Sequence, residues 1–325
     1  MSKQFTIDFG NWEINDYPSR PVTPANSNSE SVELRAKLRN EPPLFDGTIY
    51  YMSFGSGSSG NSCYVGTRNG GVIIDAGVRA EVITEALERV GIGMEKVKGI
   101  LLTHDHTDHS KFVYTLLRCN KHLRLYCTPR VLTALLRRHN ISRRVKDYHV
   151  PVYKEFEFTL GDFSITAFDV PHDAADNAGF HLKAGDRHFV IATDMGQVTD
   201  RANYYMRMAN YLVIESNYDS EMLARGPYPE YLKARIRTSH GHLDNMDCAG
   251  FLADAASSRL SHIFLCHLSK DNNTPETALS TIRRALENRG WKIGSGEETL
   301  EDRNADIQLT ALPRFDITRL YVLRH

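Results

Sequence analysis

The stretch His104–His109, which reads HDHTDH, places three histidines and an aspartate at closely spaced positions directly after an apolar run. Histidine is the commonest side chain that binds metal ions in proteins, and carboxylate oxygens suit the same cations. A turn that leaves a strand can direct His104 and His106 at one ion. The same turn can direct Asp108 and His109 at a second ion. We therefore predict a site for two divalent metal ions, a device that hydrolyses esters, amides and phosphodiesters.

Four more candidate residues stand where an apolar strand meets a loop: Asp75, His172, Asp194 and His267. Polar side chains at such points are typical of active sites built on a rigid scaffold. Each of them alone is also typical of a helix cap or a turn. Together with the histidine run, they argue against the simpler interpretation, in which Asp108 caps a helix and the histidines lie at the surface.

The run H-x-H-x-D-H at residues 104–109 closely resembles the signature of the metallo-β-lactamase superfamily. In that superfamily Asp75 corresponds to an aspartate that orients a ligand histidine rather than binding metal. His106 stands where a diiron flavoprotein branch carries glutamate, which favours hydrolytic metal ions, with zinc expected and manganese as the alternative. The implied ligands are His104, His106 and His172 for the first ion, Asp108, His109 and His267 for the second, and Asp194 as the bridge between them.

The histidine run is one of six short motifs whose combination resembles the YycJ/WalJ-type family, over about residues 50–280. Members of that family are regarded as metal-dependent nucleases with DNA exonuclease activity linked to repair, which implies DNA as a partner more than RNA. The departures remove no ligand: Asp105 stands where glutamate is frequent, and Thr107 and Asp244 where serine is frequent. The motifs are S-G-S-S-G-N at 56–61, T-H-x-H-x-D-H at 103–109, T-D-x-G at 193–196, E-S-N at 215–217, G-H-L-x-N at 241–245 and H-L-S-x-x-N-N at 267–273.

The Gly/Ser segment at residues 53–62 lies between two predicted strands. Such a loop brings backbone N–H groups and hydroxyls close to phosphate oxygens, although Gly/Ser segments also serve as linkers. We predict phosphate contacts from five side chains, which are Ser56, Ser58, Ser59, Asn61 and Asn217.

The chemistry predicted for this site is attack by a hydroxide that forms because two metal ions lower the pKa of a shared water. We expect Asp194 and the hydroxide to bridge the ions. The leaving oxygen needs a proton, for which His242 is the candidate donor and Glu215 its orienting carboxylate. The related tRNase Z branch uses a similar pair. The alternatives are a histidine at a helix entry that contacts only backbone, and a glutamate in a structural ion pair.

The chain has 325 residues, of which 41% are hydrophobic and 24% charged, as is ordinary for a globular protein. Its 39 Lys and Arg residues nearly balance its 40 Asp and Glu residues, so a nucleic-acid partner must be held by local patches. Each candidate patch is equally consistent with a solvated helix face, and most candidate stacking tyrosines with packing. The patches are 137–139, 143–146 and 233–237, and the tyrosines are Tyr148, Tyr218 and Tyr228.

The five cysteines form no C-x-x-C pair and are odd in number, so we expect reduced thiols rather than disulfides. Cys266 lies in an apolar strand and is expected in the core. The N-terminus, Met1–Phe5, lacks an apolar signal segment, and no stretch approaches the ~18 apolar residues of a membrane helix. We therefore expect a cytoplasmic protein without a membrane partner.

Two regions differ in composition. Residues 1–47 are rich in Ser, Pro and Asn and are predicted to be a poorly ordered or surface-draped extension. Residues 48–325 are predicted to form the catalytic domain, of the α/β (α+β) class. Its strands fall in two runs, the second a meander that begins at 148–152, with helices between and after them. This order favours two facing sheets with helices outside, and the resemblance implies a four-layer αββα sandwich.

The predicted function is that of a metal-dependent phosphodiesterase, a DNA exonuclease. A small-molecule hydrolase of the same fold, acting on a thioester, lactone or cyclic nucleotide, has the same ligand set and stays open. A non-catalytic binding module ranks lower, because such a protein is expected to lose ligands and this chain keeps all seven. The oligomeric state is left open by the sequence.

Overall fold

The computed structural model describes residues 45–325, apart from residues 139–140, 298, 300 and 325 and the side chain of residue 301. The predicted extension 1–47 therefore lies outside the described residues except for its last three. None of the helices in the described part of the chain combines the length and apolar composition that crossing a lipid bilayer requires.

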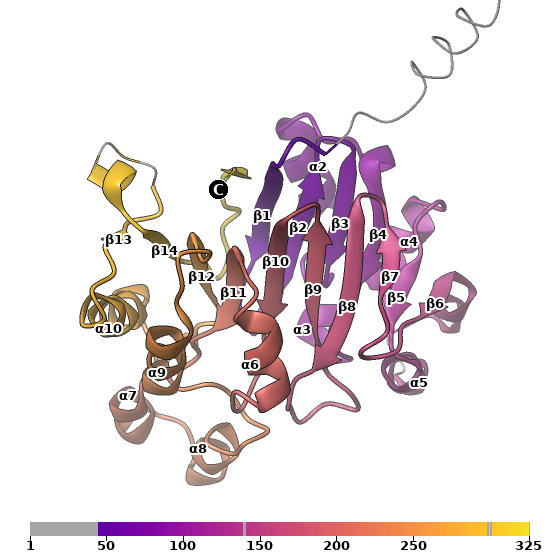
Figure 1. Ribbon diagram of the computed structural model, residues 1–325. Helices are drawn as coiled ribbons and strands as arrows, with labels where there is room; N and C mark the ends of the chain where they lie inside the picture. The colour runs from indigo at the N-terminus through magenta and orange to yellow at the C-terminus, as the bar shows by residue number, and fades with distance from the viewer. Residues whose placement is uncertain (1–44, 139–140, 298, 300, 325) are drawn as a thin grey trace, which may run out of the picture. The chain divides into compact units, whose positions relative to one another are not determined.

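Two mixed β-sheets form the centre of the domain (Figure 1). In each sheet one half is antiparallel and the other parallel, so that several strands end at the same edge. The first sheet has the order β15 (Tyr321–Leu323), β1 (Ile49–Gly55), β2 (Ser62–Thr67), β3 (Gly70–Ile74), β4 (Val97–Leu101), β5 (Leu125–Cys127), β6 (His149–Pro151). The second has the order β13 (Ile293–Gly294), β14 (Ile307–Ala311), β12 (His262–Cys266), β11 (Tyr211–Glu215), β10 (Arg187–Ala192), β9 (Ala178–Ala184), β8 (Phe163–Asp169), β7 (Phe158–Leu160).

Helices cover the outer face of both sheets, which gives four layers. The outer face of the first sheet packs on α2 (Ala80–Arg89), α4 (Val113–Cys119) and α5 (Pro129–Arg137). The second packs on α6 (Asp200–Met206), α9 (Asn245–Ala255) and α10 (Pro275–Glu287). The remaining helices are short: α3 (Thr107–Ser110), α7 (Ser220–Arg225), α8 (Glu230–Ile236) and the 3₁₀ turns Met94–Lys96, Arg143–Tyr148 and Glu301–Asn304.

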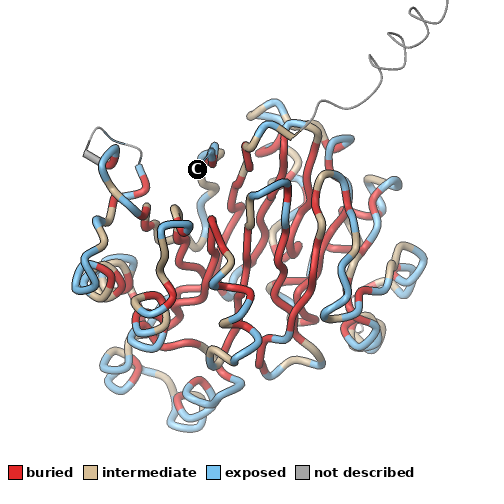
Figure 2. Tube along the Cα trace, viewed as in Figure 1, coloured by how far each residue is buried: buried red, intermediate tan, exposed pale blue. Residues whose placement is uncertain are grey.

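Strands buried on both faces explain why the sequence reads as continuous apolar runs rather than alternating ones. Phe189 and Ile191 of β10 point into the core between the sheets, and Val190 and Ala192 point under the outer helices. The inner core is aromatic, with the ring of Tyr51 centred 4.6 Å from that of Phe264. The buried segments in Figure 2 follow the strands for this reason.

One prediction about the strands was wrong. The segment 148–152 does not begin the meander, because β6 pairs in parallel with β5 in the first sheet. The meander of the second sheet begins at β7. Several regular elements were not anticipated, among them α6, α7, β14 and the C-terminal strand β15, which pairs with β1 at the edge of the first sheet. Cys266 is buried in the core, as expected.

Candidate metal centre

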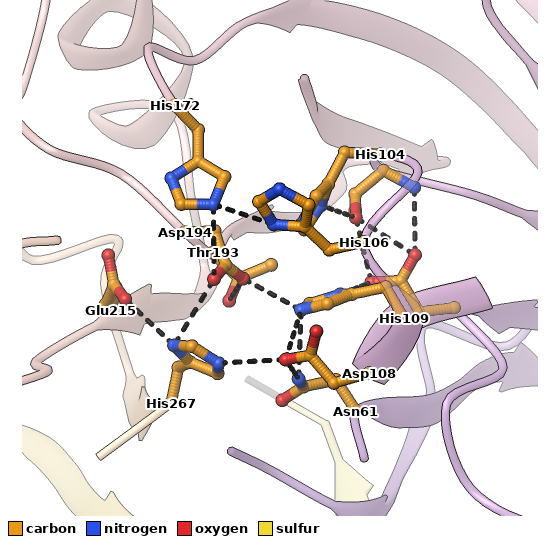
Figure 3. Close-up of polar contacts among 12 residues, drawn as sticks. Asn61, His104, His106, Asp108, His109, His172, Thr193, Asp194, Glu215 and His267 are labelled. Atoms are coloured by element: carbon orange, nitrogen blue, oxygen red, sulfur yellow. Dashed lines mark hydrogen bonds and ion pairs between the residues drawn. The ribbon is translucent and has the colours of Figure 1, made fainter. Parts of the chain in front are cut away.

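Loops that follow strands of both sheets bring the candidate residues together in one cluster (Figure 3). The first sheet supplies Asp75 after β3 and the run His104–His109 after β4, which continues into α3. The second sheet supplies His172 after β8, Asp194 after β10 and His267 after β12. The two sheets thus contribute opposite sides of the same site.

Three of these strand-end residues have left-handed backbone conformations. The φ angles are 59° at Asp75, 50° at Asp194 and 55° at His267. Side chains other than glycine rarely adopt such angles, and they concentrate where surrounding structure holds a functional group in place. The turn at each strand end therefore directs its side chain into the cluster at a cost in backbone energy.

The first group of predicted ligands converges. His104, His106 and His172 each offer a nitrogen, and these nitrogens lie within 4.8 Å of one another. His106 Nδ1 is 3.2 Å from His172 Nε2. The other ring nitrogen of His172 donates to the carbonyl of Gly241 at 3.0 Å, so Nε2 is the atom left for a ligand.

The second group also converges, and Asp194 lies between the two. Asp108 Oδ2 is 3.6 Å from His109 Nε2 and 3.5 Å from His267 Nε2. Asp194 Oδ2 is 3.0 Å from His109 Nε2, and its Oδ1 is 3.8 Å from His172 Nε2. The carboxylate of Asp194 therefore faces members of both groups, as a bridge requires.

Asp75 orients two of the histidines. Its Oδ2 accepts from His109 Nδ1 at 2.7 Å. Thr103 Oγ1 lies 3.0 Å from both oxygens of Asp75 and 2.9 Å from His104 Nδ1. Because the inner nitrogens are engaged in this way, the Nε2 atoms of His104 and His109 face the cluster. Sequence analysis did not predict this role of Thr103, although its position directly before His104 could have suggested it.

Glu215 is completely buried and contacts two histidines at once. Its Oε1 lies 2.7 Å from His242 Nδ1 and 3.0 Å from His267 Nδ1. Its Oε2 accepts from the backbone N–H groups of Met195 and Leu243 at 2.6 and 3.2 Å. The predicted Glu215–His242 pair is thus formed, and the same carboxylate also sets the orientation of a candidate ligand.

The electrostatics of the cluster favour positive charge. Burial lowers the pKa of His109, but the carboxylates of Asp194, Asp75 and Asp108 outweigh burial and hold that pKa well above its ordinary value. Burial likewise opposes charge on His267, yet Asp194, Asp108 and Glu215 raise its pKa to about 10. The cluster therefore holds an excess of negative charge, which its histidines balance only when they are protonated.

The donor set fits divalent cations by a further observation. The Nε2 atoms of His104 and His267 are buried without a hydrogen-bond partner among the described residues. Buried polar atoms without partners are rare and costly, so each calls for a ligand. Burial also holds the pKa of His104 well below its ordinary value, which keeps a lone pair available on that ring. Imidazole and carboxylate donors are the set that zinc and related cations prefer.

Most of the side chains predicted to contact phosphate are already engaged. Ser56 Oγ accepts from the backbone N–H of His267 at 2.9 Å. Asn217 Nδ2 donates to the carbonyl of His267 at 2.6 Å, and Asn61 Nδ2 lies 3.2 Å from Asp108 Oδ2. All three are buried and hold the ligand loops, a task that sequence reasoning missed. Only the side chains of Ser58 and Ser59 are exposed, and phosphate contact by this set stays a prediction.

Comparison with known proteins agrees with this geometry. Residues 71–264 match the sequence model of the Beta-lactamase superfamily domain. The chain is 34% identical over 256 residues to exodeoxyribonuclease YycJ of Bacillus anthracis, which covers 77% of this chain and 94% of that protein. It is 34% identical over 245 residues to exodeoxyribonuclease WalJ of Streptococcus pneumoniae, with 75% and 90% covered. The chain belongs to the metallo-β-lactamase superfamily, in the branch of YycJ and WalJ.

A solved structure supports the fold of this superfamily member. Zn(2+)-bound PqqB from Methylobacterium extorquens superposes with a TM-score of 0.56 at 15% identity, over 83% of this chain and 99% of that one. The predicted family and the αββα fold class are confirmed. The chain is a hydrolase of the metallo-β-lactamase fold, a fold that implies divalent metal ions.

The contacts of Asp75 generate a prediction about metal affinity. Asp75→Ala removes the acceptor for His109 Nδ1 and for Thr103, so we expect metal affinity to fall about 10- to 100-fold. Competition with a chromogenic chelator measures this change. The matched control is Asp162→Ala, since Asp162 accepts from Thr67 and Asn69 away from the cluster and its loss should leave affinity unchanged. Unchanged metal affinity in folded Asp75→Ala would contradict the orienting role.

Proposed function

We propose that this protein is a metal-dependent phosphodiesterase that removes nucleotides from the ends of DNA, with two divalent cations per chain. Zinc is the expected metal and manganese the alternative. The observation that carries the proposal is the convergence of two ligand groups on either side of Asp194, in a chain 34% identical to two exodeoxyribonucleases. A link to DNA repair and a cytoplasmic location stay predictions.

The two cations would be held by the histidines and Asp108 of the two groups, with Asp194 bridging. When bound, such a pair supplies a hydroxide at neutral pH and draws charge from the phosphate oxygens. The task of the protein is then to hold the donors still. The hydrogen bonds from Asp75, Thr103, Glu215 and the carbonyl of Gly241 perform that task.

His242 is proposed to protonate the leaving oxygen. Its Nδ1 is fixed by Glu215, which leaves Nε2 as the atom that can hold a proton toward a substrate. The ring of His242 lies 5.2 Å from the rings of both His172 and His267, and its side chain is partly exposed. A proton donor at this distance from the ligands is placed beside the reacting phosphate without occupying a ligand position.

A basic groove beside α5 supports a nucleic-acid substrate. Arg130 and Arg137 lie two turns apart on one face of α5, and with Ala175 they line a groove of about 320 Å³. Ala175 follows His172 by three residues, and its N–H donates to Asp105 at 3.1 Å. Neither arginine forms an ion pair within the described residues, and the adjoining Tyr153 is 59% exposed. Unpaired arginines beside an exposed ring are typical of single-strand binding.

Several other basic residues of the predicted patches are already engaged by the protein. Arg138 is paired with Asp105 and Arg235 with Asp173. Lys233 is buried and donates to the carbonyl of Ala224. Residue 139 lies outside the described residues. Tyr218 is buried, so it packs rather than stacks on a base.

The test of the proposed function is digestion of end-labelled DNA and RNA by the metal-loaded protein. We expect about two ions per chain by elemental analysis and progressive shortening of DNA from an end. His104→Ala opens the first ligand group, so it should lose metal and activity together. The alternative, a small-molecule hydrolase, would instead show turnover of thioesters, lactones or cyclic nucleotides with no cleavage of any nucleic acid.

His242→Ala should lower turnover of DNA by ~10²–10⁴-fold while the metal content stays at the wild-type value. A p-nitrophenyl phosphodiester has a good leaving group that needs little protonation, so the variant should be far less impaired on it. Steady-state kinetics on both substrates provide the measurement. Equal loss on both, or loss of metal, would show that His242 is a ligand or a structural residue.

The double variant Arg130→Gln/Arg137→Gln should bind single-stranded DNA less tightly and with a weaker salt dependence. Each lost phosphate contact on a single strand reduces the slope of log affinity against log salt by about 0.7. Arg284→Gln/Arg289→Gln removes the same charge at the end of α10, away from the groove, and serves as the control (Figure 1). Identical salt slopes in the two double variants would remove this groove from the substrate path.

A further inference from the structure

A second cavity is lined in part by Gly241 and His242. It has a volume of about 180 Å³. The carbonyl of Gly241 accepts from the candidate ligand His172, so the lining of the cavity is joined to the metal centre by a hydrogen bond. A group seated in the cavity is therefore held next to the reacting atoms.

The lining of the cavity combines apolar and polar side chains. Tyr228, Leu232 and the buried Ile236 come from α8 and the segment before it. Ser58, Asn217 and Ser269 are polar and come from three separate loops. The ring of Tyr228 is fixed because its hydroxyl donates to Asp271 at 3.1 Å.

A charged pair lies between the cavity and the metal centre. Asp173 Oδ1 is 3.5 Å from His172 Nε2 and 3.9 Å from His106 Nε2, and its other oxygen accepts from Arg235. Arg235 also lines the cavity, and its side chain is 59% exposed. The guanidinium is thus a partly exposed part of the cavity lining, and Asp173 links it to the candidate ligand His172.

We propose that this cavity binds the base of the terminal nucleotide of the strand, with its flat face against Tyr228 and Leu232 and its polar edge toward the polar side chains Ser58, Asn217 and Ser269 of the lining. The proposal rests on the proposed function. A volume of about 180 Å³ is below the roughly 300–1,000 Å³ of pockets for drug-sized ligands, so the cavity accommodates one ring system rather than a longer segment. The strand beyond that nucleotide then has the α5 groove as its path, and a chain end becomes the preferred substrate.

The experiment compares single-stranded oligonucleotides that end in thymidine with the same oligonucleotides ending in an abasic nucleotide, at either end in turn. For wild-type metal-loaded protein we expect kcat/KM to be about 5- to 100-fold higher for the thymidine end, with most of the difference in KM, because a base stacked on an aromatic ring contributes that much. Tyr228→Ala should bring this ratio close to one, and Tyr228→Phe, which keeps the ring, should retain it.

The control is Tyr231→Ala, since Tyr231 is 77% exposed on α8, three residues after Tyr228, and does not line the cavity. It should keep the wild-type ratio. A wild-type ratio near one at both ends would overturn the base pocket. So would a Tyr228→Ala variant whose kcat/KM falls equally on both substrates. In either case, digestion of DNA by the wild type would leave the proposed function standing. Absence of any nucleic-acid digestion by the wild type would overturn both proposals.

Discussion

In four of the five candidate ligand histidines one ring nitrogen is held by a hydrogen bond, which leaves the other nitrogen free to face the cluster. Asp75 holds His109, Thr103 holds His104, the carbonyl of Gly241 holds His172, and Glu215 holds His267. A ring fixed in this way has one rotamer and one tautomer, so its free nitrogen points at a defined place before any cation arrives. The rest of the site depends on these bonds.

The same arrangement explains why the protein tolerates so many buried polar groups. Asp75, Asp194 and Glu215 are almost completely buried, and burying unpaired charge is costly. Hydrogen bonds from backbone and ring N–H groups satisfy part of each carboxylate. The negative charge that remains raises the pKa values of His109 and His267, and divalent cations would neutralise it in place of protons.

Layered architecture makes this concentration of charge possible. The core between the sheets is apolar and aromatic, and the charged groups of the cluster lie at the ends of strands or in the loops that follow them. The cluster needs residues from both sheets, since each ligand group combines residues that follow a strand of the first sheet with a histidine that follows a strand of the second. The two cavities also have different origins, because α5 covers the first sheet and α8 lies in the connection between β11 and β12 of the second.

Sequence alone determined the identity of the candidate ligands, since the spacing within His104–His109 and the polar residues after apolar strands are local signals. It also determined the class of fold, through the order of strands and helices and the resemblance to a superfamily. It could not assign β6 to its sheet, because a short strand has no local mark of its partner. Nor could it show that Ser56, Asn61 and Asn217 hold ligand loops, because hydrogen bonds such as Ser56 to His267 join residues 211 positions apart. Only tertiary structure decides which nitrogen of a histidine is free and which distant loops share a cavity, because both depend on contacts between segments far apart in the chain, such as Asp75 with His109 and Glu215 with His267.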